Sequence, residues 1–69
     1  MKLSARNQLT GTVTAIDEGV VTTTVKVELA GGQTITSSIT KEAATELGIE
    51  VGKEVTAIVK ASSVMLATD

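Results

Sequence analysis

The fold is decided by residues 9–29, LTGTVTAIDEGVVTTTVKVEL. The first part of this stretch, residues 9–15, alternates apolar or small residues with threonines, and its last part, residues 21–29, alternates mostly apolar residues with polar ones. A period of two places alternate side chains on opposite faces of a strand, so both parts are predicted to be strands with one apolar face. Residues 17–19, Asp-Glu-Gly, supply turn chemistry between them. The stretch therefore predicts the first two strands of a meander.

The pattern continues with a third strand and then breaks once. Residues 34–39 are rich in β-branched residues, and the two glycines before them favour a hairpin turn. The alternation stops at residues 40–48, where Thr40 suits a helix N-cap and Gly48 suits the position just after a helix. This segment is predicted to be a helix of about two turns.

Two further strands are predicted after the helix. Residues 55–60 alternate again, and residues 62–66 form a last, shorter β-prone run. Five short strands with one helix between the third and fourth predict an all-β fold with one short helix, a five-stranded OB-like barrel. No linker, repeat or low-complexity segment interrupts residues 1–69, so we expect a single domain.

The composition excludes several classes of function. The chain has 69 residues with no histidine, cysteine, aromatic residue or proline, and its formal net charge is −2. Ordinary zinc or copper sites and thiol chemistry are therefore excluded, and the usual general bases are missing, so we expect a protein that is not an enzyme. The acidic balance disfavours nucleic acid, and no apolar stretch is long enough to span a membrane. The cytoplasm is the default compartment.

The small size of the chain predicts self-association. A domain of roughly 60 residues buries only about 60% of the surface that its unfolded chain exposes. This chain has neither disulfides nor aromatic residues to strengthen its core. We therefore expect a homo-oligomer.

Basic and polar residues suggest three positions for binding an oxyanion. Arg6, the only arginine, stands in residues 4–7, Ser-Ala-Arg-Asn, where a guanidinium lies beside a hydroxyl and an amide. Thr40 opens the predicted helix, whose first turn leaves backbone N–H groups unpaired. Residues 60–63, Lys-Ala-Ser-Ser, combine a cation with small hydroxyl residues. Taken singly, these positions also fit a surface ion pair, a helix cap and a strand-end lysine.

The motifs around these positions resemble those of a known family. Residues 4–11 read SARNQLTG, residues 47–55 read LGIEVGKEV, and residues 59–65 read VKASSVM. In this order they resemble the molbindins, small molybdate-binding proteins of the Mop or TOBE family. The resemblance covers essentially the whole chain, and because the chain begins at Met1 we expect a free-standing protein.

The resemblance implies a ligand, an assembly and a set of site residues. The ligand is molybdate, with tungstate as an analogue and no organic cofactor, bound at sites between subunits for intracellular storage or homeostasis. The assembly is a homo-oligomer, a hexamer built as a trimer of dimers. The implied oxyanion-binding residues are Ser4, Arg6, Thr40, Ala43, Lys60, Ala61 and Ser62, with Ser37 and Ser38 for a second site. Molybdenum enters as molybdate, so no side chain is expected to bond the metal directly.

Some of these positions are weaker candidates than others. Related sensor domains can carry serine where Ala43 stands, so this site either loses a hydroxyl or uses the main chain there. Ala61 is expected to act through its backbone N–H, with Ser62 as an adjacent hydroxyl. Ser37 and Ser38 also fit a purely structural role in a strand, without a ligand.

Two functions from other classes remain as alternatives. The chain would be a regulatory module if its ligand state were reported to an attached partner protein. It would be a structural interaction barrel if Arg6 and Lys60 made ordinary ion pairs, and failure to bind any oxyanion would favour this last interpretation.

Overall fold

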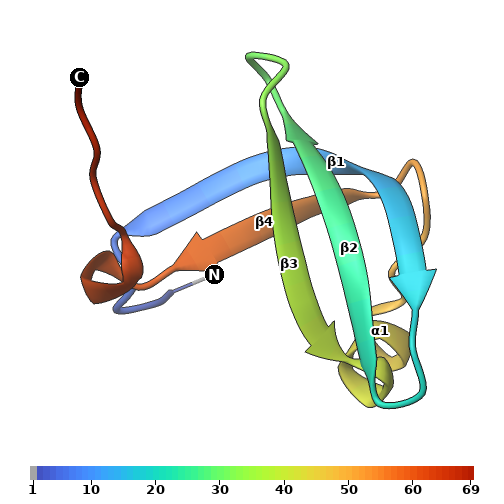
Figure 1. Ribbon diagram of the computed structural model, residues 1–69. Coiled ribbons are helices and arrows are strands. Elements are labelled where there is room, and N and C mark those ends of the chain that lie inside the picture. The colour runs from blue at the N-terminus through green and yellow to red at the C-terminus, as the bar shows by residue number, and fades with distance from the viewer. Residues whose placement is uncertain (1) are drawn as a thin grey trace.

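The computed structural model describes residues 2–69 and consists mostly of one antiparallel sheet (Figure 1). The elements are β1 (Asn7–Glu18), β2 (Thr22–Leu29), β3 (Thr34–Thr40), α1 (Lys41–Leu47), β4 (Glu54–Val59) and the 3-10 turn η1 (Ala61–Ser63). The strands lie in the order β3-β2-β1-β4, and each neighbouring pair is antiparallel. The sheet curls into a half-barrel with α1 at one end, which confirms a mainly β fold with one short helix.

Strand β1 is long enough to take two partners in succession. Its first half, residues 7–12, pairs with β4, and its second half, from Gly11 onward, pairs with β2. Gly11 and Thr12 are paired on both sides. We call residues 11–29 with β3 and α1 the packed half, and residues 7–10 with residues 56–59 the ribbon end.

A bulge interrupts β1 inside the packed half. The register with β2 shifts between Val13 and Ala15, so that one residue of β1 has no partner there. As a result, Ile16 is the next side chain of β1 after Val13 that packs against the core, and Ala15 is exposed. The alternation predicted for residues 9–15 is correct as far as Val13 and wrong at Ala15, because the extra residue reverses the faces of the strand.

The buried core is small and lies in the packed half. Val13, Val25 and Val27 have only 1%, 4% and 3% of their surface exposed. Half-buried apolar residues from all four strands and the loop after α1 pack against these valines. They are Ile16, Leu29, Ile35, Ile39, Ile49 and Val55. The hydrophobic contribution to stability is therefore concentrated where β1, β2 and β3 lie side by side.

Helix α1 has the boundaries that its capping residues predict. The Thr40 hydroxyl accepts a hydrogen bond from the Ala43 N–H at 3.0 Å, and Gly48 adopts a left-handed conformation with φ of 64°. Lys53 Nζ donates to the carbonyl oxygens of Leu47 and Gly48 at 2.8 and 3.2 Å. The predicted helix is confirmed, and Leu47, a large apolar residue at its end, is 60% exposed.

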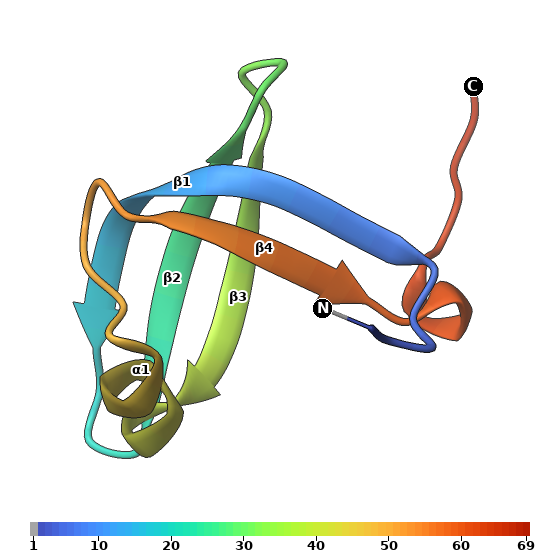
Figure 2. The ribbon, with the colours of Figure 1, turned by 180° about the vertical axis from the view of Figure 1, so that it is seen from behind.

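Residues 2–69 contribute four strands to this sheet, and the expected fifth strand is not confirmed. The predicted segment, residues 62–66, begins within η1 and then continues without regular structure. A strand needs a neighbour to satisfy its backbone, and this segment leads away from the sheet (Figures 1 and 2). Its apolar residues Val64, Met65 and Leu66 are 46%, 92% and 93% exposed. The half-barrel therefore stays open within one chain.

Candidate anion-binding site

A groove beyond the ribbon end brings together most of the predicted site residues. Arg6 comes just before β1 and Lys60 just after β4, and the last register pair of these strands joins Asn7 to Val59. Antiparallel pairing therefore places residues from the two ends of the chain side by side. The lining residues are Ser4, Ala5, Arg6, Ile58, Lys60, Ala61 and Ser62.

The charge of this groove suits an anion. Arg6 and Lys60 supply two cations, Ser4 and Ser62 supply two hydroxyls, and none of the seven lining residues is acidic. All four of these side chains are exposed, so solvent and salt screen the cations as long as the groove stays open. A dianion with several acceptor oxygens matches this set of donors.

Backbone N–H groups add to the donors of the groove. Within η1 the Ser63 N–H donates to the Lys60 carbonyl at 2.8 Å, and the Val64 N–H donates to the Ala61 carbonyl at 3.2 Å. Among residues 2–69, no backbone hydrogen bond uses the N–H of Ala61 or Ser62. The N–H that was expected to act at Ala61 is therefore not engaged by the turn.

Thr40 and Ala43 lie at the opposite end of the molecule. Helix α1 belongs to the packed half, whereas η1 lies beyond the ribbon end, as both ribbon views show (Figures 1 and 2), and Ala61 and Ser62 of η1 line the groove. Strand β1, 12 residues long, runs between these ends, which amounts to about 35 Å of strand at about 3.3 Å per residue. A tetrahedral oxyanion is far smaller, so one chain does not surround one anion with all the predicted residues. The Ala43 N–H is also already bonded to Thr40.

Ser37 and Ser38 lie on β3, at the edge of the sheet. Ser37 is half-buried and Ser38 is exposed, because successive residues of a strand point to opposite faces. Neither serine lines the groove. A second oxyanion site at these residues stays a prediction.

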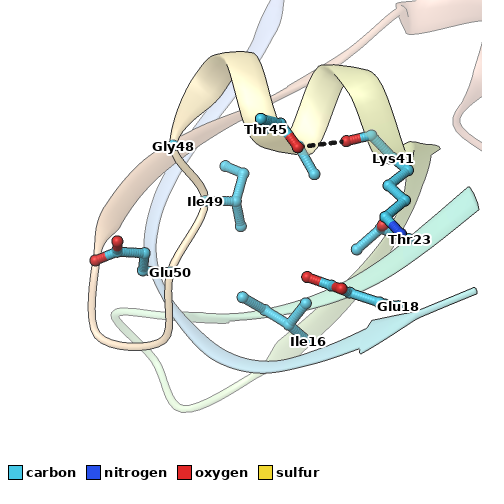
Figure 3. A pocket seen from close by; sticks show the side chains of 9 residues that line it. Ile16, Glu18, Thr23, Lys41, Thr45, Gly48, Ile49 and Glu50 are labelled. Carbon is cyan, nitrogen blue, oxygen red and sulfur yellow. Dashed lines mark hydrogen bonds between the residues drawn. The ribbon is translucent and has the colours of Figure 1, made fainter.

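A second hollow lies between α1 and the adjoining ends of β1 and β2 (Figure 3). Lys41 lines it together with two carboxylates, Glu18 and Glu50. Thr45 Oγ1 donates to the Lys41 carbonyl at 3.1 Å, whereas the Thr23 hydroxyl has no hydrogen-bond partner among the described residues although the residue is 1% exposed. Two carboxylates beside one cation make this hollow a poor site for a dianion, so the groove is the better candidate.

Sequence reasoning missed two residues of the groove, Ala5 and Ile58. Ile58 is 45% exposed although it is a large apolar residue in a strand. The alternation of β4 places Val55 and Val59 on the inner face and Ile58 on the outer one. An isoleucine on the outer face, two positions before Lys60, was the signal that could have identified it.

The chain is similar to proteins whose names refer to molybdenum. The TOBE domain family matches residues 3–66. A probable molybdenum-pterin-binding protein from Haemophilus influenzae is 46% identical over 69 residues, which is 100% of both chains. A molybdate binding protein from Sporomusa ovata has a solved structure with a TM-score of 0.93 and 32% identity, over 99% of this chain and 100% of that one. The cytoplasmic molybdate-binding protein ModG, solved with molybdate bound, has a TM-score of 0.91 and 51% identity, over 94% of this chain and 46% of that one.

Across residues 2–69, no helix has both the length and the apolar character that a membrane span requires.

Proposed function

The chain belongs to the TOBE domain family, and on this basis we propose that it binds molybdate reversibly in the groove beyond the ribbon end. The observation that carries this proposal is the placement of Arg6 and Lys60 in one groove without an acidic lining residue. Molybdate is a tetrahedral dianion, so two cations balance its charge, while hydroxyl and N–H groups donate to its four oxygens. The function is binding, without a chemical step.

Arg6 is expected to contribute strongly to affinity. One cation 4 Å from a unit charge contributes about 4 kcal/mol at an effective dielectric of 20, before desolvation is subtracted. Because the open groove is solvated, the net effect is smaller. We expect Arg6→Ala to weaken molybdate binding at least about tenfold, or about 1.4 kcal/mol.

Titration calorimetry with molybdate, tungstate and sulfate tests the site. The matched control is Lys26→Ala, which removes one positive charge from an exposed position on β2, away from the groove. Arg6→Ala should lose affinity while Lys26→Ala binds like the natural protein. Tungstate should bind like molybdate, and the smaller sulfate should bind poorly. Equal affinities in the two variants would reject Arg6 as a ligand.

We further propose that Thr40 acts on the groove of a second copy of this chain, with Ala43 beside it in the first turn of α1. Their distance from Arg6 within one chain supports this arrangement. Both ends also expose apolar residues that an association would cover: Leu3, Leu9 and Ile58 toward the ribbon end, and Leu47 and Val51 near the end of α1. Covering the groove would also exclude water and strengthen the attraction of its cations for the anion.

The same association would supply the missing strand. Residues 62–66 extend away from their own sheet with exposed apolar side chains, and the half-barrel has open edges at β3 and β4. We propose that this segment pairs with an edge of another copy and so completes a five-stranded OB-like barrel. A hexamer built as a trimer of dimers is the assembly that we expect, with native mass spectrometry as its test.

Subunit mixing tests whether a site needs two copies. Thr40→Asp retains a good helix N-cap but adds a negative charge that repels the dianion, and Arg6→Ala removes the cation. If Thr40 and Arg6 of one site come from different chains, random mixing of the two variants restores about a quarter of the sites. If they act within one chain, mixing restores none.

Storage or homeostasis of molybdate in the cytoplasm is the role that we infer. Sites completed by association make ligand binding and assembly stabilise one another by mass action. The similarity to a cytoplasmic molybdate-binding protein supports the compartment. Native mass spectrometry with and without molybdate would count the sites, and an assembly that gains sulfate as readily as molybdate would contradict this role.

A further inference from the structure

The groove depends on the end of a two-stranded ribbon. Residues 7–10 pair with β4, whereas pairing with β2 begins only at Gly11. A ribbon of two strands is marginally stable in water, so its end opens more readily than the packed half. Opening would separate Arg6 from Lys60, and the apparent affinity for an anion falls in proportion to the fraction of chains that are closed.

A side-chain hydrogen bond holds the last pair of this ribbon. Asn7 Nδ2 donates to the Val59 carbonyl oxygen at 3.1 Å and joins residues 52 positions apart in the sequence. Both residues are half-buried, which shields the bond from water. The residues next to this pair along the chain are Arg6 and Lys60. The bond therefore joins the two residues that are adjacent in the sequence to the cations of the groove.

We propose that Asn7 is a positioning residue for the anion site, an inference that rests on the proposed function. Its side chain ties the start of β1 to the end of β4, so that Arg6 and Lys60 are held together before the ligand arrives. Asn7 is not among the residues that line the groove, and its amide donates to Val59. Asn7 thus acts on affinity through the backbone that it holds.

The test compares Asn7→Ala with Gln8→Ala. Gln8 is the adjacent residue, carries the same amide group and is exposed, so its removal controls for loss of an amide from this strand. Asn7→Ala should raise the Kd for molybdate by up to about fivefold, because one lost hydrogen bond lowers the equilibrium constant for closing by about this factor and the Kd rises as the closed fraction falls. Hydrogen-exchange mass spectrometry of the ligand-free proteins should also show faster exchange in peptides covering residues 56–62, with no change in peptides covering residues 22–29. Gln8→Ala should change neither readout.

The two readouts separate this inference from its alternatives. An unchanged Kd for Asn7→Ala would overturn the positioning role, and so would weaker binding without faster exchange, because Asn7 would then act on the anion directly. If the natural protein binds no molybdate, the proposed function itself fails, and that result is visible before any variant is compared. Should Asn7→Ala not fold, Asn7→Ser makes a smaller change with the same expectations, and circular dichroism verifies folding.

Discussion

The packed half and the ribbon end share strand β1 but differ in what holds them together. In the packed half β1 pairs with β2, β2 pairs with β3, and three valines are almost completely buried. At the ribbon end β1 has β4 alone, and Leu9 and Ile58 remain 38% and 45% exposed. The difference teaches that this small chain concentrates its buried core at one end, whereas the groove proposed for the anion lies at the other. Substitutions that affect only the packed half or only the ribbon end are therefore the most direct tests of this difference.

The largest expected effect belongs to Gly11, the residue at which the two regions meet. A Cβ at this position would lie 2.5 Å from the Glu28 carbonyl oxygen and 2.7 Å from Val27 Cγ1. Because a backbone atom cannot rotate away, Gly11→Ala must move β1 relative to β2, and we expect a loss of about 3 kcal/mol in the free energy of unfolding. Urea denaturation at fixed protein concentration measures it.

The control for this prediction is Gly31→Ala. Nothing lies within 4 Å of a Cβ at Gly31, and its φ is not positive. This variant should change stability by less than about 0.5 kcal/mol. If Gly11→Ala proved as stable as Gly31→Ala, the close approach of β1 and β2 would not limit the fold.

Much of the packed half could be predicted from the sequence, because local rules decide it. The alternation in residues 21–29 identifies Val25 and Val27 as core, and Thr40 and Gly48 mark the ends of the helix. The bulge after Val13 was not predictable, because it depends on how β1 bends across β2. Residues 62–66 have strand character in the sequence but pair with no strand of residues 2–69, and periodicity carries no information about neighbours.

The candidate site could be predicted only in part, for a different reason. Arg6 and Lys60 were identified separately by residue type and by resemblance, and the structure shows that antiparallel pairing brings them together. The role of Asn7 was not visible in the sequence, where its amide appeared to be another donor for the ligand. A side-chain bond to a residue 52 positions away becomes apparent only once the register of β1 and β4 is known.

The second prediction compares one residue from each region. Val25→Ala removes buried methyl groups from the packed half and leaves a cavity, so we expect a loss of about 2 kcal/mol. Ile58→Ala removes more side-chain atoms from the ribbon end, but 45% of that side chain is exposed within one chain. In conditions that keep the chain monomeric it should therefore cost less than Val25→Ala, about 1 kcal/mol. Thermal unfolding of both variants at one concentration tests the contrast. A larger loss for Ile58→Ala would show that the ribbon end is packed against another surface in solution.

The third prediction concerns the unpartnered hydroxyl in the packed half. Thr23 is 1% exposed, and its Oγ1 has no hydrogen-bond partner among residues 2–69. Valine has nearly the same shape without the polar atom, so Thr23→Val should raise the free energy of unfolding by about 1 kcal/mol. Thr22→Val, at an exposed position on the same strand, serves as the control. A loss of stability in Thr23→Val would indicate that a water or a ligand satisfies the hydroxyl from the hollow of Figure 3.

The smallest expected effect belongs to Lys53, which connects the packed half to β4. Its carbonyl accepts a hydrogen bond from the Val13 N–H at 2.9 Å, and its Nζ donates to the last carbonyls of α1. Lys53→Met retains the backbone bond and most of the stem but removes the cation from the negative end of the helix dipole. We expect a loss of about 0.5 kcal/mol at low salt that shrinks at high salt, because this charge is exposed to solvent.

Lys26→Met, the same change on an exposed face of β2, separates this effect from a general change in charge. Because Lys53 supports α1 and not the groove, Lys53→Met should leave hydrogen exchange at residues 56–62 unchanged, in contrast to Asn7→Ala. A faster exchange there would mean that the helix end and the ribbon end are energetically coupled through β4. The separation of the packed half from the proposed binding groove would then fail at the loop that joins them.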